Sequence, residues 1–432
     1  MQRNAASGLF TKPSNIERCT ALFWRHPVKR ITKYIRLCAL SAILMAAGCA
    51  FQKTPEPVVT GPALVKLQVS AYPALTDDMN YEGMDRAIRM SLTYLKKVPA
   101  DRVFMFGADP CTAGHLIRSL EFFQKILASR PSPAELSAEI QKNYQIYQAA
   151  GDAATGKVLF TGYYEPVLNG SPVETGKYRY PLYSRPDDLV TIELSRFSPK
   201  FSGETLIGRY TGKTVVPYYD RKDIDAKKDF HQRARVLAWV DDRIGLFFLQ
   251  IQGSGKIQMG ATSEINAHYQ ITNGRPYRSI GKILVDEGKI PRAQVSMQRI
   301  RAYLKAHPQE VDAILDANPS YVFFKLEPDG PLGNLNVPLT PGRSVAVDKK
   351  CFPPAALMYI QAQKPVMDGS GEIASWEPLD RFAVNQDTGG AITGAGRADI
   401  FWGSGSYAEL AAGYLQHRGN MYFLVLKPDI DR

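Results

Sequence analysis

Two aspartates near the end of the chain are the residues best suited to chemistry. Asp387 and Asp399 lie twelve positions apart and are separated by the glycine-rich residues 389–396. Glycine permits close backbone approach, so this stretch can bring both carboxylates to one rim of a barrel. Phe401 and Trp402 could supply an apolar wall and a platform for a sugar ring. Both the wall and the second carboxylate would raise the pKa of Asp399, giving an acid that is protonated near neutral pH.

The residues alone leave a structural alternative open, in which Asp387 caps a turn and Asp399 lies on an exposed loop. Other common catalytic motifs are missing from the sequence. The six histidines are scattered outside any HExxH motif, and no serine lies in a GxSxG motif. Gly212-Lys213-Thr214 is similar to part of a phosphate-binding loop, but Ile207 stands where that motif needs glycine. Carboxylates remain as the candidate catalytic groups, and we expect no metal or organic cofactor.

The first 48 residues have the pattern of a lipoprotein signal peptide. Residues 29–36 are basic, the eleven residues 37–47 are almost wholly apolar, and small residues precede Cys49. This order is typical of secretory signals, and the apolar run is too short to cross a membrane. We expect Cys49 to be lipidated. Because residue 50 is alanine rather than aspartate, we expect the lipid to anchor the protein at the periplasmic face of the outer membrane. An unmodified Cys49 after a cleaved signal is the alternative.

The net charge is unevenly distributed along the chain. The whole sequence has a formal net charge of +11, but residues 1–48 contain eight Lys/Arg and one Glu. Without them the net charge is about +4. This balance does not favour electrostatic binding of DNA or RNA, so we expect no nucleic-acid partner. Cys111 and Cys351 remain after the signal and could pair in an oxidising periplasm, although the sequence does not fix whether they do.

Hydrophobic periodicity and turn residues predict the main elements. Residues 49–65 contain several prolines and are expected to form a tether between lipid and body. A capping box at Ser132 and Glu135 opens the third of the predicted helices. These helices are 84–98, 113–128, 133 to about 150, 294–306 and 308–317. The predicted strands include 157–161 and 246–252, and the chain is mainly β from 321 onward.

The residues around the two aspartates resemble the C-terminal signature of the membrane-bound lytic murein transglycosylase A family. This region is called the 3D domain after three aspartates, and the third corresponds to Asp348 in segment 342–348. Further segments are similar to the family and occur in the family's order: 160–166, 250–255, 277–282 and 318–325. The resemblance as a whole covers residues 157–428.

The resemblance implies a mainly β fold with flanking helices, of the α+β class. A double-psi β-barrel domain is expected to be joined to an inserted second β-domain, with a groove for the glycan between them. The barrel domain is expected to be discontinuous. Residues 66–166 supply its helical part and first strand, residues 167–326 form the insert, and residues 327–432 supply the part with the catalytic aspartate.

The resemblance also assigns roles to individual residues. The single catalytic acid corresponds to Asp399, with Asp387 beside it. The expected substrate-binding residues are Thr161, Tyr164, Gln250, Gln252, Gly253, Ser254, Asp348 and Trp402. Of these, Asp348 is expected mainly to support loop structure.

The implied activity is that of a lytic exotransglycosylase, a lyase that cleaves the β-1,4 bond between N-acetylmuramic acid and N-acetylglucosamine in peptidoglycan. It leaves 1,6-anhydromuramic ends. The implied partners are glycan strands, the lipid of the outer membrane and other cell-wall enzymes. Two alternatives stay open: a conventional muramidase, in which Asp387 activates water and Asp399 is the acid, and a non-catalytic wall-binding lipoprotein. The residues themselves do not show whether glycan strands are cleaved at their ends or internally.

Overall fold

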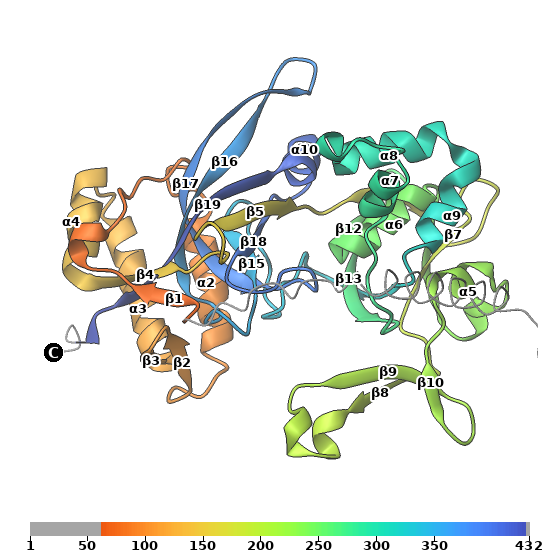
Figure 1. The fold of residues 1–432 in the computed structure, drawn as a ribbon, viewed down its shortest axis with the longest axis horizontal. Helices are drawn as coiled ribbons and strands as arrows, with labels where there is room; N and C mark the ends of the chain where they lie inside the picture. Colours follow the sequence, from red (N-terminus) through yellow and green to blue (C-terminus); the bar gives the residue numbers. More distant parts are fainter. Residues whose placement is uncertain (1–61, 429–432) are drawn as a thin grey trace, which may run out of the picture. The chain divides into compact units, whose positions relative to one another are not determined.

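A closed ring of six β-strands forms the centre of one part of the molecule, which we call the barrel domain (Figure 1). The computed structural model describes residues 62–428, so the predicted signal peptide, Cys49 and most of the tether lie outside the described residues. The ring contains β5 (Val158–Tyr163), β15 (Ser344–Val347), β16 (Leu357–Met367), β17 (Ile373–Asp387), β18 (Arg397–Phe401) and β19 (Gln416–Leu426).

The ring runs in the order β19-β16-β17-β15-β18-β5, and β5 closes it by pairing again with β19. Two pairs are parallel, β15 with β17 and β18 with β5, and the other pairs are antiparallel. Outside the ring, β4 (Tyr144–Ala149) pairs with β19, and β1 (Leu64–Lys66) pairs with β4. The closed barrel is mainly β as expected, while its double-psi form stays a prediction.

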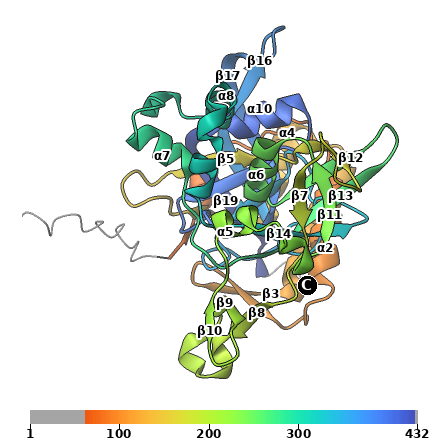
Figure 2. The same ribbon diagram turned by 90° about the vertical axis from the view of Figure 1, so that its right-hand side faces the viewer.

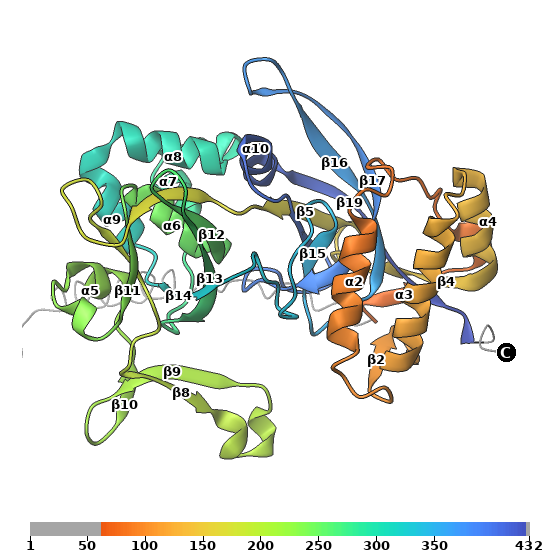
Figure 3. The same ribbon diagram turned by 180° about the vertical axis from the view of Figure 1, so that it is seen from behind.

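Helices cover the outer face of this barrel (Figure 3). They are α2 (Met84–Leu95), α3 (Ala113–Ala128), α4 (Pro133–Asn143) and α10 (Ser406–Tyr414), and a hairpin of β2 (Val103–Phe106) and β3 (Asp109–Thr112) lies between α2 and α3 in the chain. The predicted apolar face of α3 is buried in the barrel core, where the Phe123 ring lies 4.9 Å from that of Phe382. Because α3 packs on β19, the last residues of that strand are buried on both faces and are almost all apolar.

A buried ion pair links the first residues of the barrel domain to the barrel strands. Arg343 precedes β15, and its guanidinium donates two hydrogen bonds of 2.6 and 2.8 Å to the carboxylate of Asp77. Both side chains are 0% exposed. Arg343 Nη1 also donates to the carbonyl of Phe382 on β17 at 2.7 Å. The bidentate pair therefore fixes residue 77 to two strands of the ring.

The second part of the molecule, which we call the insert domain, is built on a sheet in the order β14-β13-β12-β6-β11-β7. Its strands are β6 (Val167–Ser171), β7 (Tyr180–Tyr183), β11 (Val236–Val240), β12 (Ser254–Met259), β13 (Glu264–Thr272) and β14 (Val322–Glu327). Its helices are α5 (Arg221–Ala226), α6 (Arg243–Gln252), α7 (Ile280–Asp286), α8 (Met297–Ala306) and α9 (Val311–Asp316). A separate three-stranded sheet contains β8 (Leu189–Glu193), β9 (Thr205–Tyr210) and β10 (Val215–Pro217) and forms an arm of this domain (Figure 2).

The prediction of a strand at 246–252 was wrong, because these residues belong to helix α6. The helix is buried on two sides: Phe247 and Phe248 pack into one apolar cluster, while Leu246 and Leu249 pack into another. A helix that is apolar all round shows no 3.6-residue periodicity, so its short run resembles a buried strand. Gly253, with φ of +82°, ends the helix.

The third predicted helix was too long. Its capping box is present, but the helix ends at Asn143 and the chain continues as β4. The Tyr144 and Ile146 side chains are buried in the barrel core, and β4 pairs with β1 and β19 on its two edges. Tertiary pairing therefore overrides the local helical tendency. The predicted helices 294–306 and 308–317 are present as the shorter α8 and α9.

Between residues 62 and 428, the structure contains no helix that combines the length and the apolar character needed to span a membrane. Within the described part of the chain, Cys111 and Cys351, which could have paired, form no disulfide. The exact domain limits stay a prediction.

Candidate active site

A groove of about 930 Å³ is lined by residues of both domains. From the barrel domain come residues of segments 161–163, 332–339 and 387–399, and from the insert domain come Arg221 and residues of segments 250–254, 268–277 and 318–325. Both Asp387 and Asp399 line this groove. The glycine-rich segment between them therefore does bring the two carboxylates to one cavity.

Asp399 lies on β18 between two partner strands. It is opposite Thr161 on the parallel strand β5 and opposite Ala346 on β15. Because side chains alternate along a strand, Arg397 and Asp399 share the groove face while Ala398 and Ile400 are buried in the barrel. Thr161 Oγ1 donates to Asp399 Oδ1 at 2.7 Å, and Arg397 Nη2 donates to Thr161 Oγ1 at 3.1 Å.

The environment of Asp399 makes it a weaker acid than an exposed aspartate. The pKa of Asp399 is raised to about 6: burial is the largest cause and the charge of Asp387 adds to it, whereas the Thr161 hydrogen bond and the Arg397 charge oppose the shift. Desolvation disfavours the charged carboxylate and therefore favours the protonated one. A carboxyl group with this pKa can donate a proton near neutral pH and can take one back.

Asp387 ends β17 and accepts three hydrogen bonds. Its Oδ2 accepts from the phenol of Tyr163 at 2.8 Å, and its Oδ1 accepts from the backbone N–H groups of Asn334 and Thr388, each at 2.8 Å. Burial raises the pKa of Asp387, and these three donors oppose the rise. Burial together with Asp387 also raises the pKa of Tyr163, so the phenol remains a donor.

Most of the expected substrate-binding residues lie in the groove. Thr161, Gln250, Gln252, Gly253 and Ser254 all line it. The last four belong to the end of α6 and the turn into β12, rather than to the strand that the sequence suggested. Gln252 also accepts a 3.0 Å hydrogen bond from the backbone N–H of Tyr164, which ties this turn to the chain that leaves β5.

Three of the expected residues are not among those that line the groove. Trp402 is buried, with its ring 5.8 Å from that of Tyr407 and with the guanidinium of Arg381 5.7 Å above it. The side chain of Tyr164 is buried too. Asp348 accepts from the backbone N–H groups of Lys350 and Gly394, so it joins two loops, as its expected supporting role requires.

Tyr163 and Arg397 are groove residues that contact the two aspartates or their partners and were not predicted from the sequence. Tyr163 and Arg397 each lie two positions from a recognised site residue, Thr161 and Asp399, on the same strand. Strand alternation could have found both of them, because residues i and i+2 share a face. The same rule places Tyr164 on the opposite face from Thr161. Among residues 62–428, no group of three or more His, Cys, Asp or Glu side chains is placed to hold a metal ion.

Comparison with known proteins gives a consistent result. The model of the MltA specific insert domain matches residues 159–325, and that of the 3D domain matches residues 343–425. Membrane-bound lytic murein transglycosylase A of Escherichia coli K12 is 33% identical over 285 residues, which are 65% of this chain and 69% of that protein. The namesake in Vibrio cholerae is 29% identical over 298 residues, which are 68% of this chain and 72% of that protein.

Solved structures agree with these sequence matches. A membrane-bound lytic murein transglycosylase from Agrobacterium tumefaciens has a TM-score of 0.68 at 28% identity, covering 84% of this chain and 98% of that one. Escherichia coli MltA with bound chitohexaose has a TM-score of 0.65 at 26% identity, covering 85% and 96%. The family models and these relatives together show that the chain belongs to the membrane-bound lytic murein transglycosylase A family.

Proposed function

We propose that this protein is a lytic transglycosylase that cleaves the β-1,4 bond between N-acetylmuramic acid and N-acetylglucosamine in peptidoglycan and forms 1,6-anhydromuramic ends. Family membership supports the reaction class. The observation that carries the proposal is Asp399, a carboxyl group in the groove whose pKa is raised to about 6. That value suits a group that must first give a proton and then accept one.

In the proposed mechanism, protonated Asp399 donates to the glycosidic oxygen as the bond to C1 of the muramic residue breaks. Thr161 donates to Oδ1, which leaves Oδ2 as the oxygen that carries the proton. The resulting oxocarbenium-like centre is attacked at C1 by the C6 hydroxyl of the same sugar. The ionised Asp399 removes the proton of that hydroxyl, so the acid is regenerated and no water is consumed.

Asp387 has a supporting role in this mechanism. Its negative charge raises the pKa of Asp399 before cleavage, and it stabilises the positive charge that develops on the sugar ring. The three hydrogen bonds to Asp387 hold its carboxylate in place at the groove wall. Asp387 would instead activate water in a conventional muramidase.

The groove offers partners for a glycan strand. Amide side chains such as Gln250, Gln252 and Asn334 line it, and such groups can bond to sugar hydroxyls and acetamides. The Escherichia coli relative is described with bound chitohexaose, a chain of amino sugars. We place the glycan of this protein's substrate in the groove. The relatives are named as membrane-bound, and anchoring through a lipidated Cys49 at the periplasmic face of the outer membrane is part of the proposal.

The experiment that tests the reaction is mass spectrometry of muropeptides released from purified sacculi. Wild-type protein is expected to release anhydro-muropeptides, and Asp399→Asn to release almost none. Products that are one water heavier would identify a hydrolase. Binding to sacculi without any released product would support the wall-binding alternative.

A further inference from the structure

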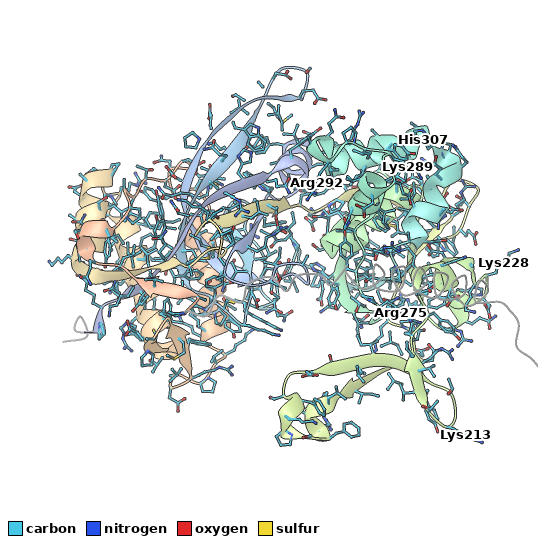
Figure 4. The ribbon with its side chains drawn as sticks, viewed as in Figure 1. Lys213, Lys228, Arg275, Lys289, Arg292 and His307 are labelled. Atoms are coloured by element: carbon cyan, nitrogen blue, oxygen red, sulfur yellow. The ribbon has the colours of Figure 1, made fainter. Side chains whose placement is uncertain are left out.

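The insert domain carries the net positive charge of the protein body. Residues 167–326 contain 24 Lys/Arg and 17 Asp/Glu, whereas the other residues after position 48 contain 21 and 24. Figure 4 shows Lys213, Lys228 and Arg275 among the basic side chains of this domain. The sugar rings carry no charge, and in a peptide-bearing strand the lactyl carboxyl of each muramic residue is amide-linked to its peptide. The uneven charge therefore indicates that the insert domain meets the acidic groups of the peptides.

A second cavity, of about 390 Å³, lies in the insert domain among β7, α5, α6 and α9. We call it the branch cavity. Arg221 and Gln250 line both this cavity and the groove, so the two spaces adjoin at these residues. A substrate in the groove could therefore reach the branch cavity with a side branch.

The branch cavity contains charges of both signs. Its basic and acidic lining residues are Arg179, Arg221, Lys222 and Arg243, with Asp225, Asp312 and Asp316. Arg243 Nη2 lies 3.2 Å from the carboxylate of Asp225 and 3.6 Å from that of Asp316, and Arg243 Nη1 donates to Asp312. These ion pairs hold the acidic side chains in place within the cavity wall.

Arg221 provides a fixed positive charge where the cavity meets the groove. Its Nε and Nη2 donate to the carbonyls of Asn318 and Ser320 at 3.1 and 2.7 Å. Its guanidinium also lies over the rings of Phe247 and Tyr321, 4.7 and 5.0 Å from their centroids. An arginine held in this way loses little freedom when it binds a carboxylate.

Among the described residues, the buried acceptor Gln250 Oε1 in the cavity wall has no hydrogen-bond partner, and Asp316 Oδ1 has only its 3.6 Å ion pair with Arg243. Gln250 is only 4% exposed, and it stands at the junction with the groove. Leaving a buried acceptor unpaired is costly, so a ligand that supplies N–H donors would be favoured here. Peptide amides and ammonium groups are such donors.

We propose that the branch cavity binds the peptide branch of a peptidoglycan strand whose glycan occupies the groove. This inference rests on the proposed function, because it assumes that substrate. The peptide branch carries several carboxylates and the amine of a diamino acid, which match the basic and acidic lining residues. The site therefore selects strands that still carry their peptides over strands that have lost them.

The test compares two substrates, peptide-bearing glycan strands and the same strands after an amidase has removed the peptides. The variant is Arg179→Glu combined with Lys222→Glu, two exposed cavity residues. We expect its kcat/KM to fall roughly tenfold on peptide-bearing strands, because it reverses the charges that meet the carboxylates. On peptide-free strands its kcat/KM should equal that of the wild type.

Lys213→Glu combined with Lys228→Glu is the matched control, because it makes the same change of charge in the same domain outside the lining of the cavity. If both double variants lose kcat/KM equally on peptide-bearing strands, the loss comes from the overall charge of the domain and not from the branch cavity. A cavity variant that is unchanged on peptide-bearing strands, or equally impaired on both substrates, would overturn the peptide-branch site. Failure of the wild type to form anhydro ends on either substrate would instead remove the proposed function.

Discussion

Thr161 on β5 donates a 2.7 Å hydrogen bond to the carboxylate of Asp399 on the neighbouring parallel strand β18. The two residues are 238 positions apart in the chain. Closure of the barrel places them directly opposite each other, so the candidate acid depends on the pairing of the strand that precedes the insert domain with a strand that follows it. The properties of Asp399 can therefore be changed from either strand.

Replacing the candidate acid should stop turnover without unfolding the protein. We expect Asp399→Asn to lower kcat by about 10²- to 10⁴-fold, the usual contribution of a general acid–base group. Thermal unfolding should be unchanged or shifted upward, since a neutral amide avoids the desolvation that raises the pKa of Asp399. Release of anhydro-muropeptides and a thermal melt measure the two effects. A variant that keeps its activity would remove Asp399 from the mechanism.

The pH dependence of activity should follow Asp399. The protonated form starts the reaction, so on the alkaline side of the profile kcat/KM is expected to fall as pH rises through about 6. The Thr161 hydrogen bond favours the ionised form, so Thr161→Val should raise the pKa of Asp399 and move this decline to higher pH. Thr161→Ser keeps the donor and serves as the control. A decline that stays in place in Thr161→Val would show that another group controls it.

The phenol of Tyr163 should control the ionisation of Asp387. Its hydrogen bond opposes the raised pKa of that carboxyl, so Tyr163→Phe should raise the pKa of Asp387 further. Because ionised Asp387 is needed to stabilise the cation, the acidic limb of the kcat/KM profile should move to higher pH. Asn334 donates to Asp387 only through its backbone N–H, so Asn334→Ala should leave the pH of this limb unmoved, whatever its effect on binding of the glycan. An unmoved limb in Tyr163→Phe would contradict the assigned role of Asp387.

The close packing at Gly162 should make β5 intolerant of a side chain. A Cβ at this position would lie 2.5 Å from Trp402 Nε1 and 2.9 Å from the backbone of Ala412. We expect Gly162→Ala to destabilise the fold by about 1–3 kcal/mol and to lower activity, since Thr161 and Tyr163 flank the glycine. Chemical denaturation measures the first effect. Gly176→Ala, in open space, is the control, and equal stability of the two variants would refute the packing argument.

The buried pair of Arg343 and Asp77 should be the most sensitive ion pair of the barrel domain. Replacing one partner, as in Asp77→Asn, leaves the other charge uncompensated in the core, and we expect a loss of about 3–5 kcal/mol in the free energy of unfolding. The exposed pair of Arg89 and Asp85 supplies the comparison, because Arg89→Met should cost less than about 1 kcal/mol. Urea unfolding curves measure the free energy of unfolding of both variants. Similar losses in the two variants would contradict the expected effect of burial.

The sequence predicted elements well where local signals acted alone. The capping box of α4 and the apolar face of α3 are both present, because each depends on residues within a few turns of one another. Helix α6 was mistaken for a strand because two clusters bury it on both sides, which removes the polar face. Likewise, β4 forms where a helix was expected because it pairs with β19, whose residues lie nearly 300 positions away.

At the candidate site, the sequence located Asp387, Asp399 and the turn after α6, since glycine-rich segments and a family resemblance mark them. Trp402 was placed wrongly because adjacency to Asp399 does not determine which face of a strand a side chain occupies. The roles of Tyr163 and Arg397 depend on contacts across strands, and only the alternation within β5 and β18 could have indicated them.

In the proposed mechanism, the substrate's own C6 hydroxyl, activated by the single acid Asp399, takes the place of water. The most direct measurement is digestion of purified sacculi in water labelled with heavy oxygen, followed by mass spectrometry of the released muropeptides. The mechanism predicts anhydro ends without label from the wild type, with no such products from Asp399→Asn. Incorporation of one heavy oxygen atom at each new muramic end would show that water attacks C1 and would contradict the mechanism.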